Sequence, residues 1–341
     1  MRQILITPEI KRMAKQYAKD LFKDKGDAFV QPVAGLKDLI KDLQEVNDCL
    51  ANKDRYINYL KEIVKDYNKL KQLLPSEFAN YKAKYDAIIG DSSLSQKVKY
   101  RKAPLPSKKS ERDKLATSEK EFYKLIVARM RYEDTRISLG AYMKKIGINT
   151  CVYCNIAKAA VSQDGQEVYY PFDHGKPKSE YPFLCICFFN LYPCCDNCNR
   201  HKSDDEKKGF PLYVESDPVS DPFVFNIDQT TIDEKDPLSV VVDFRARDAA
   251  DDKKAEKYNK DFRIGDLYNT DDEKRSSFQM VRLINKHRAS YPAALTASVP
   301  SLSVIREELF TDVLGVKDDE IIFTDMKKKL KLDTAKDAKL I

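Results

Sequence analysis

The chain has 341 residues, of which 42% are hydrophobic and 33% charged, with ten glycines and a formal net charge of +6. This length allows two or three domains, and no apolar run approaches the roughly 18 residues that a membrane span requires. The composition therefore argues against a membrane protein, and we expect a soluble, mostly helical α+β protein.

The N-terminus lacks the apolar segment of a secretory signal, which predicts a cytoplasmic protein. Thr7 and Pro8 resemble a helix start, and Gly26 a helix stop, so a helix is expected over 8–25. Apolar residues then repeat at helical spacing over 36–50 and 56–70, which predicts an antiparallel pair of helices. A shorter helix is expected from Pro75 towards Ile89.

The segment from Asp91 to Ser110 is predicted to be a linker because it holds serines, lysines and the Pro104-Leu105-Pro106 break. From Lys97 to Lys145 there are fifteen basic and six acidic residues. Such a surplus attracts a polyanion, although a lysine-rich helix is also typical of a solvated face.

A helical pattern resumes at Ser118, with Phe122, Leu125, Ile126 and Met130 on its buried side. On this pattern, the basic residues Lys124, Arg129, Arg131 and Arg136 are expected to be more exposed.

Further along, a strand is expected over 238–244 and helices over 272–288 and 302–315, while 327–339 has no clear periodicity. These patterns predict four regions: N-terminal helices over 1–90, a basic linker over 91–117, a helix with a cysteine-rich module over 118–215, and a mixed, mostly helical region over 216–341.

Eight cysteines in a chain expected in a reducing compartment favour metal binding over disulfides. Cys151/Cys154 and Cys195/Cys198 are two C-x2-C pairs, which supply four thiolates for a structural zinc ion. Cys194 competes with Cys195, but only Cys195 has a partner at the right spacing. The remaining cysteines, Cys49, Cys185 and Cys187, are interpreted as small apolar residues.

Between and beyond these pairs the chain reads F-D-H-G-K-P-K-S at 172–179, N-L-Y-P-C-C at 190–195 and D-N-C-N-R-H-K at 196–202. In this order the motifs resemble the HNH endonuclease family over about residues 150–205. The resemblance implies a ββα-metal module whose first strand, 167–172, leads into Asp173-His174. A short helix is expected to follow, starting near Cys195.

The resemblance implies that Asp173 and Asn199 hold one catalytic Mg²⁺ or Mn²⁺, and that Asn190 bridges the loop and orients His174. A neutral imidazole can take the proton of an attacking water, which makes His174 the candidate general base. A carboxylate and an amide oxygen suit Mg²⁺. His201 competes with Asn199 for the metal, but residues two apart do not share a helix face.

Lys176, Lys178 and Lys202 are the candidate phosphate contacts. The sequence thus predicts a phosphodiester hydrolase acting on DNA, with RNA left open as a substrate. The alternative is a zinc-dependent nucleic-acid-binding subunit without cleavage. HNH modules with such flanks also resemble nuclease subunits of bacterial anti-phage systems, which implies an ATPase or sensor partner. A homo-oligomer is a further expectation, because double-strand cleavage by one centre needs a second copy.

Overall fold

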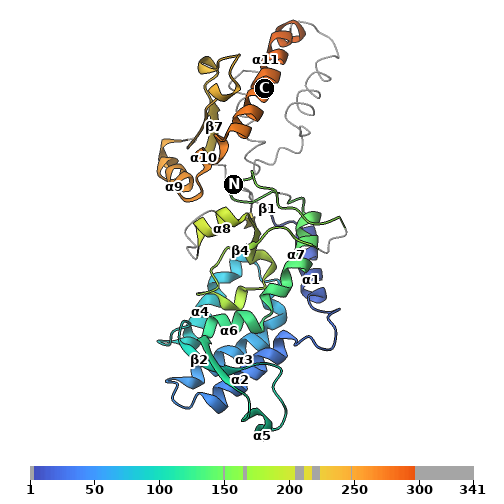
Figure 1. Ribbon diagram of the computed structural model, residues 1–341, viewed down its shortest axis with the longest axis vertical. Coiled ribbons are helices and arrows are strands. Elements are labelled where there is room, and N and C mark those ends of the chain that lie inside the picture. The colour runs from blue at the N-terminus through green and yellow to red at the C-terminus, as the bar shows by residue number, and fades with distance from the viewer. Residues whose placement is uncertain are drawn as a thin grey trace.

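The computed structural model describes residues 4–148, 150–163, 167–203, 211–216, 223–246 and 248–295. Within them the protein is α+β and mostly helical, as predicted (Figure 1). No helix among these residues is both long and apolar enough to cross a bilayer. The helices that carry the N-terminal region are α1 (Pro8–Asp20), α2 (Pro32–Val46), α3 (Lys53–Leu70) and α4 (Phe78–Ile89).

The first helix begins where the sequence predicts and ends early. Thr7 caps α1, since its Oγ1 accepts a hydrogen bond from Ile10 N at 3.3 Å, and Pro8 occupies the first turn. The helix stops at Asp20 because the chain turns at Phe22, whose φ is +68° and whose ring is buried. Gly26 is therefore not the helix stop.

The predicted helix pair is confirmed, since α2 and α3 pack against each other through their apolar faces. The segment 91–110, which was expected to be a linker, contains regular secondary structure. It contains β2 (Lys97–Arg101) and α5 (Lys109–Arg112), and β2 pairs antiparallel with β3 (Thr117–Glu121).

Arg101 fastens β2 to α2 through two carboxylates, and its side chain is fully buried. Its Nε lies 2.8 Å from Asp42 Oδ1 and its Nη2 lies 2.6 Å from Glu45 Oε2. Arg112 also binds Glu45. Sequence patterning missed this packing because the carboxylate partners lie more than fifty residues earlier.

The helix expected from Ser118 is two helices, α6 (Phe122–Arg129) and α7 (Tyr132–Lys145), separated at Arg131, whose φ is +61°. Of the arginines expected to be more exposed, Arg136 is exposed and Arg129 is half-buried, and both have partners within the protein. Arg129 Nη2 donates to the carbonyl of Arg101, and Arg136 Nε donates to that of Tyr170.

The cysteine-rich segment folds as a hairpin followed by a helix. Strand β4 (Phe172–His174) pairs antiparallel with β5 (Leu191–Pro193), and α8 (Asp196–Lys202) follows at once. The helix start near Cys195 is confirmed, since this residue caps α8. The first strand was predicted too early: β4 begins at Phe172, and Val168, within the predicted range, forms an isolated bridge with Val161.

Strand β1 (Ile4–Leu5) pairs in parallel with β6 (Tyr213–Val214), so the start of the chain lies beside the segment that follows the module. Beyond it, β7 (Phe223–Ile227) and β8 (Val242–Ala246) form an antiparallel pair, and β8 lies a few residues later than the predicted strand. The helices of this region are α9 (Asp252–Phe262), α10 (Ile264–Tyr268) and α11 (Asp271–Leu295). The predictions for 302–315 and 327–339 lie outside the described residues.

Candidate functional site

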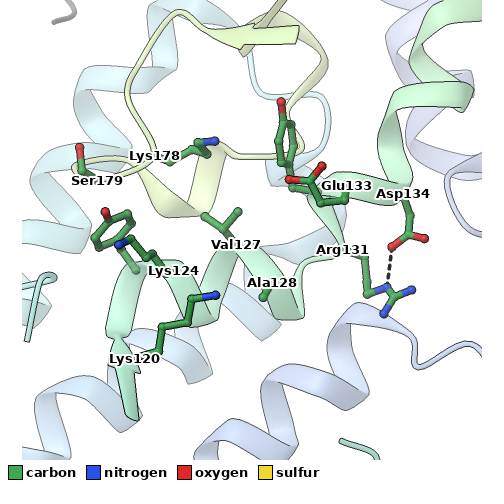
Figure 2. A pocket seen from close by; sticks show the side chains of 11 residues that line it. Lys120, Lys124, Val127, Ala128, Arg131, Glu133, Asp134, Lys178 and Ser179 are labelled. Atoms are coloured by element: carbon green, nitrogen blue, oxygen red, sulfur yellow. Dashed lines mark ion pairs between the residues drawn. The ribbon is translucent and has the colours of Figure 1, made fainter. Parts of the chain in front are cut away.

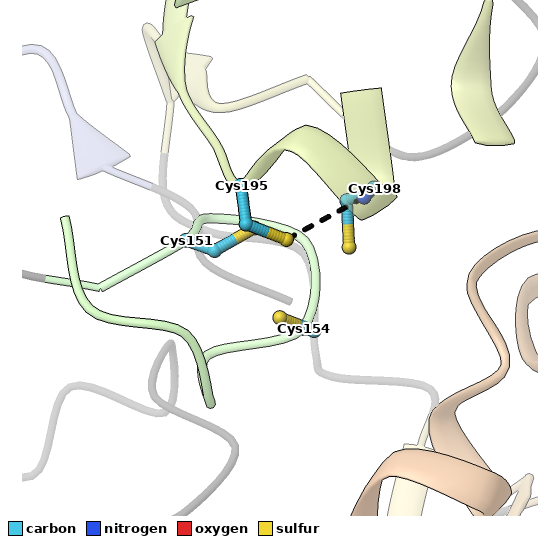
Figure 3. A group of neighbouring side chains, drawn as sticks. All are labelled: Cys151, Cys154, Cys195 and Cys198. Carbon is cyan, nitrogen blue, oxygen red and sulfur yellow. Dashed lines mark hydrogen bonds between the residues drawn. The ribbon is translucent and has the colours of Figure 1, made fainter. Parts of the chain in front are cut away.

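Four cysteine side chains meet where the loop before the hairpin approaches the start of α8. The sulfurs of Cys151, Cys154, Cys195 and Cys198 all lie within 4.8 Å of one another (Figure 3). Four converging thiols are the usual donor set of a closed, structural zinc site. The residues therefore fit the predicted zinc ion. Cys194 is not part of the cluster, since its Sγ points to the carbonyl of Pro171 at 3.7 Å.

The local backbone explains how two short loops form this cluster. The first loop closes through a hydrogen bond from Asn155 N to Cys151 O at 2.8 Å, and Asn155 takes a left-handed φ of +55°. In the second, Cys198 N donates to Cys195 Sγ at 3.4 Å. Hydrogen bonds from the neighbouring thiols, first that of Cys151, lower the pKa of Cys154 well below its usual value.

The C-terminal region covers the first loop, an arrangement that no sequence pattern predicted. Tyr258 donates to the carbonyl of Tyr153 at 2.8 Å, and Tyr268 donates to that of Cys154 at 3.2 Å. The rings of Phe262 and Tyr153 stack with centroids 4.7 Å apart. Residues more than a hundred positions away thus hold the loop in place.

His174 is buried, with 4% of its surface exposed. Its Nε2 lies 3.0 Å from the carbonyl of Cys185, and because a carbonyl only accepts, the neutral ring carries its proton on Nε2. The lone pair therefore lies on Nδ1. Burial, assisted by Lys178, lowers the pKa of His174 to about 3, so the ring is neutral at pH 7. The ring of Tyr132 lies against it, at 4.6 Å between centroids.

Asp173 is held by two neighbours. Its Oδ2 accepts a hydrogen bond from the Tyr153 hydroxyl at 2.5 Å and lies 3.0 Å from Lys202 Nζ. Burial raises the pKa of this carboxyl, while the Lys202 ammonium acts in the opposite direction. Tyr153 was not singled out by the sequence, since a tyrosine between two cysteines has no distinguishing pattern.

Lys202 differs from its predicted role as a phosphate contact. Only 2% of its side chain is exposed, and its ammonium also donates to the carbonyl of His174 at 2.8 Å. The reason is geometric: Lys202 is the last residue of α8, and the face that carries it packs on β4. Lys202 therefore joins α8 to β4, and its ammonium is not accessible to a ligand.

Asn190 is fully buried and fastens the loop that follows β4. Its Oδ1 accepts from Lys176 N at 2.7 Å, and its Nδ2 donates to the carbonyls of Lys176 and Leu184, both at 3.2 Å. Its own carbonyl accepts from Gly175 N. These bonds are of the bridging kind expected from the resemblance. The effect on catalysis stays a prediction.

The remaining predicted residues are more accessible. Asn199 is half-buried on α8, one turn before Lys202. Lys176 Nζ lies 5.5 Å from the ring of Tyr181, and Lys178 Nζ lies 4.9 Å from the ring of Tyr132. Both lysines belong to the loop after β4, as predicted.

A stretch of 64 residues is 34% identical to the Septu protein PtuB of Bacillus thuringiensis. This match covers 19% of the present chain and 23% of that protein, so it spans less than a quarter of the relative. No family model and no solved structure matches the chain. The similarity to the Septu protein is therefore distant and local.

Proposed function

We propose that this protein is a nuclease of the HNH type that hydrolyses phosphodiester bonds in DNA. The observation that carries the proposal is the order of parts along the hairpin and helix. Asp173 and His174 lie on β4, Asn190 precedes β5, and Asn199 lies on α8 immediately after a cysteine of the four-thiol cluster. This is the order that the family resemblance requires.

In this proposal His174 takes the proton of the attacking water through Nδ1, since Nε2 is committed to the carbonyl of Cys185. A group with a pKa near 3 is a weak base at pH 7. Bound phosphate would bring negative charge close to the ring, which favours the imidazolium form and raises the pKa towards the working range. Substrate would thereby activate its own base.

Zinc has a structural role in the proposal, with the four cysteines as its ligands. The catalytic ion, Mg²⁺ or Mn²⁺, would be held by Asp173 and Asn199 and would supply positive charge to the reacting phosphate. The fit is incomplete as the side chains stand, because Oδ2 of Asp173 already contacts Tyr153 and Lys202. An ion would bind the other carboxylate oxygen or displace the ammonium.

The similarity to a Septu protein supports a role in anti-phage defence. A partner protein, such as an ATPase or a sensor, belongs to the same proposal. The surface available for such a partner includes the N-terminal helices. RNA is the alternative substrate.

A second candidate is a zinc-stabilised nucleic-acid-binding subunit that does not cut. The observation that favours it is the buried pairing of Asp173 with Lys202, which satisfies the carboxylate without any metal. The buried position of His174 points the same way. Both candidates share the zinc site and differ only in chemistry.

A plasmid-nicking assay separates the two. We expect the zinc-loaded full chain to nick supercoiled plasmid with Mg²⁺ or Mn²⁺ and not without it. The His174→Ala variant should lose at least about 100-fold in rate, the usual contribution of a general base. The matched control is His201→Ala on the same module, which should keep the parent rate. Equal absence of cleavage in parent and variant, with a candidate partner added, would favour the binding subunit.

A further inference from the structure

A hollow beside the proposed site lies between α6, the first turn of α7 and the loop after β4 (Figure 2). Its volume is about 540 Å³. We call it the basic pocket, because its walls include Lys120, Lys124, Arg131 and Lys178, with Glu133 and Asp134 as the only acidic members among its described lining residues.

We propose that the basic pocket binds the phosphate backbone of the nucleic acid next to the bond that is cut. The identity of this ligand rests on the proposed nuclease function. The pocket itself is defined by its charge, its size and its position beside His174.

Four arginines of the basic segment are engaged outside the pocket. Arg101 and Arg112 bind carboxylates of α2, and Arg129 and Arg136 donate to backbone carbonyls. Arg101 and Arg112 are buried and contribute little positive surface, whereas several lysines of the segment outside the pocket, Lys102 and Lys109 among them, are exposed. The pocket differs from these lysines in its concave shape and in its position beside His174.

The four cations of the pocket differ in availability. Lys124 Nζ lies 2.8 Å from Glu121, and Arg131 Nε lies 2.8 Å from Asp134. Lys120 and Lys178 have no carboxylate partner among the described residues. Figure 2 shows these two lysines on opposite sides of Val127. A phosphate between them would be contacted from two walls.

The pocket is coupled to the proposed general base through Tyr132. This residue lines the pocket, and its ring contacts the ring of His174 at 4.6 Å. Its hydroxyl donates to the carbonyl of Phe172 at 2.8 Å, on the same strand. Lys178, the other link, is four residues after His174 and acts on its charge. A strand in the pocket therefore lies one aromatic ring away from the imidazole.

The lining also indicates which part of a nucleic acid is bound. The volume is within the range of about 300–1,000 Å³ seen for pockets that hold organic ligands, and is much larger than one phosphate needs. Among its described lining residues there is no asparagine or glutamine, the side chains that recognise the edge of adenine. Contacts of lysine with phosphate position a strand without selecting a sequence.

The test compares two pairs of lysines with the same charge change. One protein carries Lys120→Gln and Lys178→Gln, and the matched control carries Lys102→Gln and Lys109→Gln, two exposed lysines of the same basic segment outside the pocket lining. Both are made in the full-length, zinc-loaded His174→Ala background. Binding of a fluorescein-labelled DNA duplex, and of its single strand, is followed by anisotropy without Mg²⁺ over a range of salt concentrations.

We expect the pocket pair to weaken binding at least about tenfold and to reduce the dependence of log K on log[salt] by about 2, since each substitution removes one interaction between a lysine and a phosphate. The control pair should change affinity less than about twofold. Equal weakening by both pairs would overturn the proposal, and so would unchanged binding by the pocket pair. Displacement of the DNA by ATP at concentrations where inorganic phosphate has no effect would instead indicate a pocket for a free nucleotide.

The same measurements distinguish failure of the nuclease proposal from failure of the pocket proposal. A parent that binds DNA through the pocket but does not cleave with Mg²⁺ would refute the chemistry and leave the pocket assignment intact. A parent that cleaves, together with a pocket pair that binds and cleaves like it, would refute only the pocket. A parent that binds no DNA would refute the pocket proposal as well.

Discussion

Acid should destabilise this protein through one histidine. The ordinary pKa of histidine is 6.5, whereas burial lowers that of His174 to about 3. Between these two pKa values the imidazole of His174 is protonated in the unfolded chain and neutral in the folded chain. Stability contributed by this group is fully present above pH 6.5 and is lost as the pH falls from 6.5 towards 3.

The size of the effect follows from the shift. Each pH unit between the two pKa values costs about 1.4 kcal/mol, so lowering the pH from 7 to 5 should remove about 2 kcal/mol. Replacing His174 by glutamine removes the titrating group and keeps an amide that can donate to the carbonyl of Cys185. This variant should lose about 2 kcal/mol less than the parent over the same interval.

The assay is urea unfolding followed by far-ultraviolet circular dichroism at pH 7 and pH 5, with zinc present throughout. His201→Gln is the matched control and should keep the pH dependence of the parent, because it retains His174. Carboxylates titrate equally in all three proteins and cancel in the comparison. If parent and His174→Gln lose the same free energy of unfolding, the buried, neutral state of this histidine is refuted.

Three further predictions concern the metal site, the buried ion pairs and the support of the hairpin. The parent should contain one zinc ion per chain by elemental analysis. The Cys198→Ser variant should lose the zinc ion and unfold at a lower temperature. The control Cys49→Ser, at an exposed position, should keep the ion. Equal zinc contents in the two variants would contradict the site. Arg101→Met should lower the free energy of unfolding by about 3–5 kcal/mol, because it leaves buried carboxylates unpaired. Lys41→Met, at a more exposed ion pair, should lower it by less than about 1 kcal/mol. Chemical denaturation measures both changes. Tyr153→Phe should lower the free energy of unfolding by about 1–2 kcal/mol, because it removes the hydrogen bond to Asp173. The same variant should lower the nicking rate. Unchanged stability and rate would rule out the contact of Tyr153 with the hairpin.

Local patterns in the sequence were sufficient for the elements with strong periodicity or caps. The start of α1 at Thr7 and Pro8 and the pair formed by α2 and α3 follow from neighbouring residues. The start of α8 near Cys195 was expected from the family resemblance. The four-thiol cluster was predictable for a similar reason, because the spacing within each pair identifies the ligands.

The parts that could not be predicted depend on distant partners. Whether Arg101 is a surface residue or a buried one is decided by carboxylates on another helix. The same applies to Lys202. Its position one helical turn beyond Asn199 suggested phosphate binding, whereas the fold places it against Asp173. The residues that neighbour a lysine or arginine in the sequence do not indicate which group it will bind in the fold.

The tyrosines of the C-terminal region have a consequence for how the metal site is assembled. Tyr258 and Tyr268 follow the loop that they cover by more than a hundred residues, so they leave the ribosome long after both cysteine pairs. Zinc would be captured first, and the aromatic cover would close over it afterwards. Because α9 and α10 hold the first cysteine loop, the rate at which a chelator removes zinc would report how often that region opens.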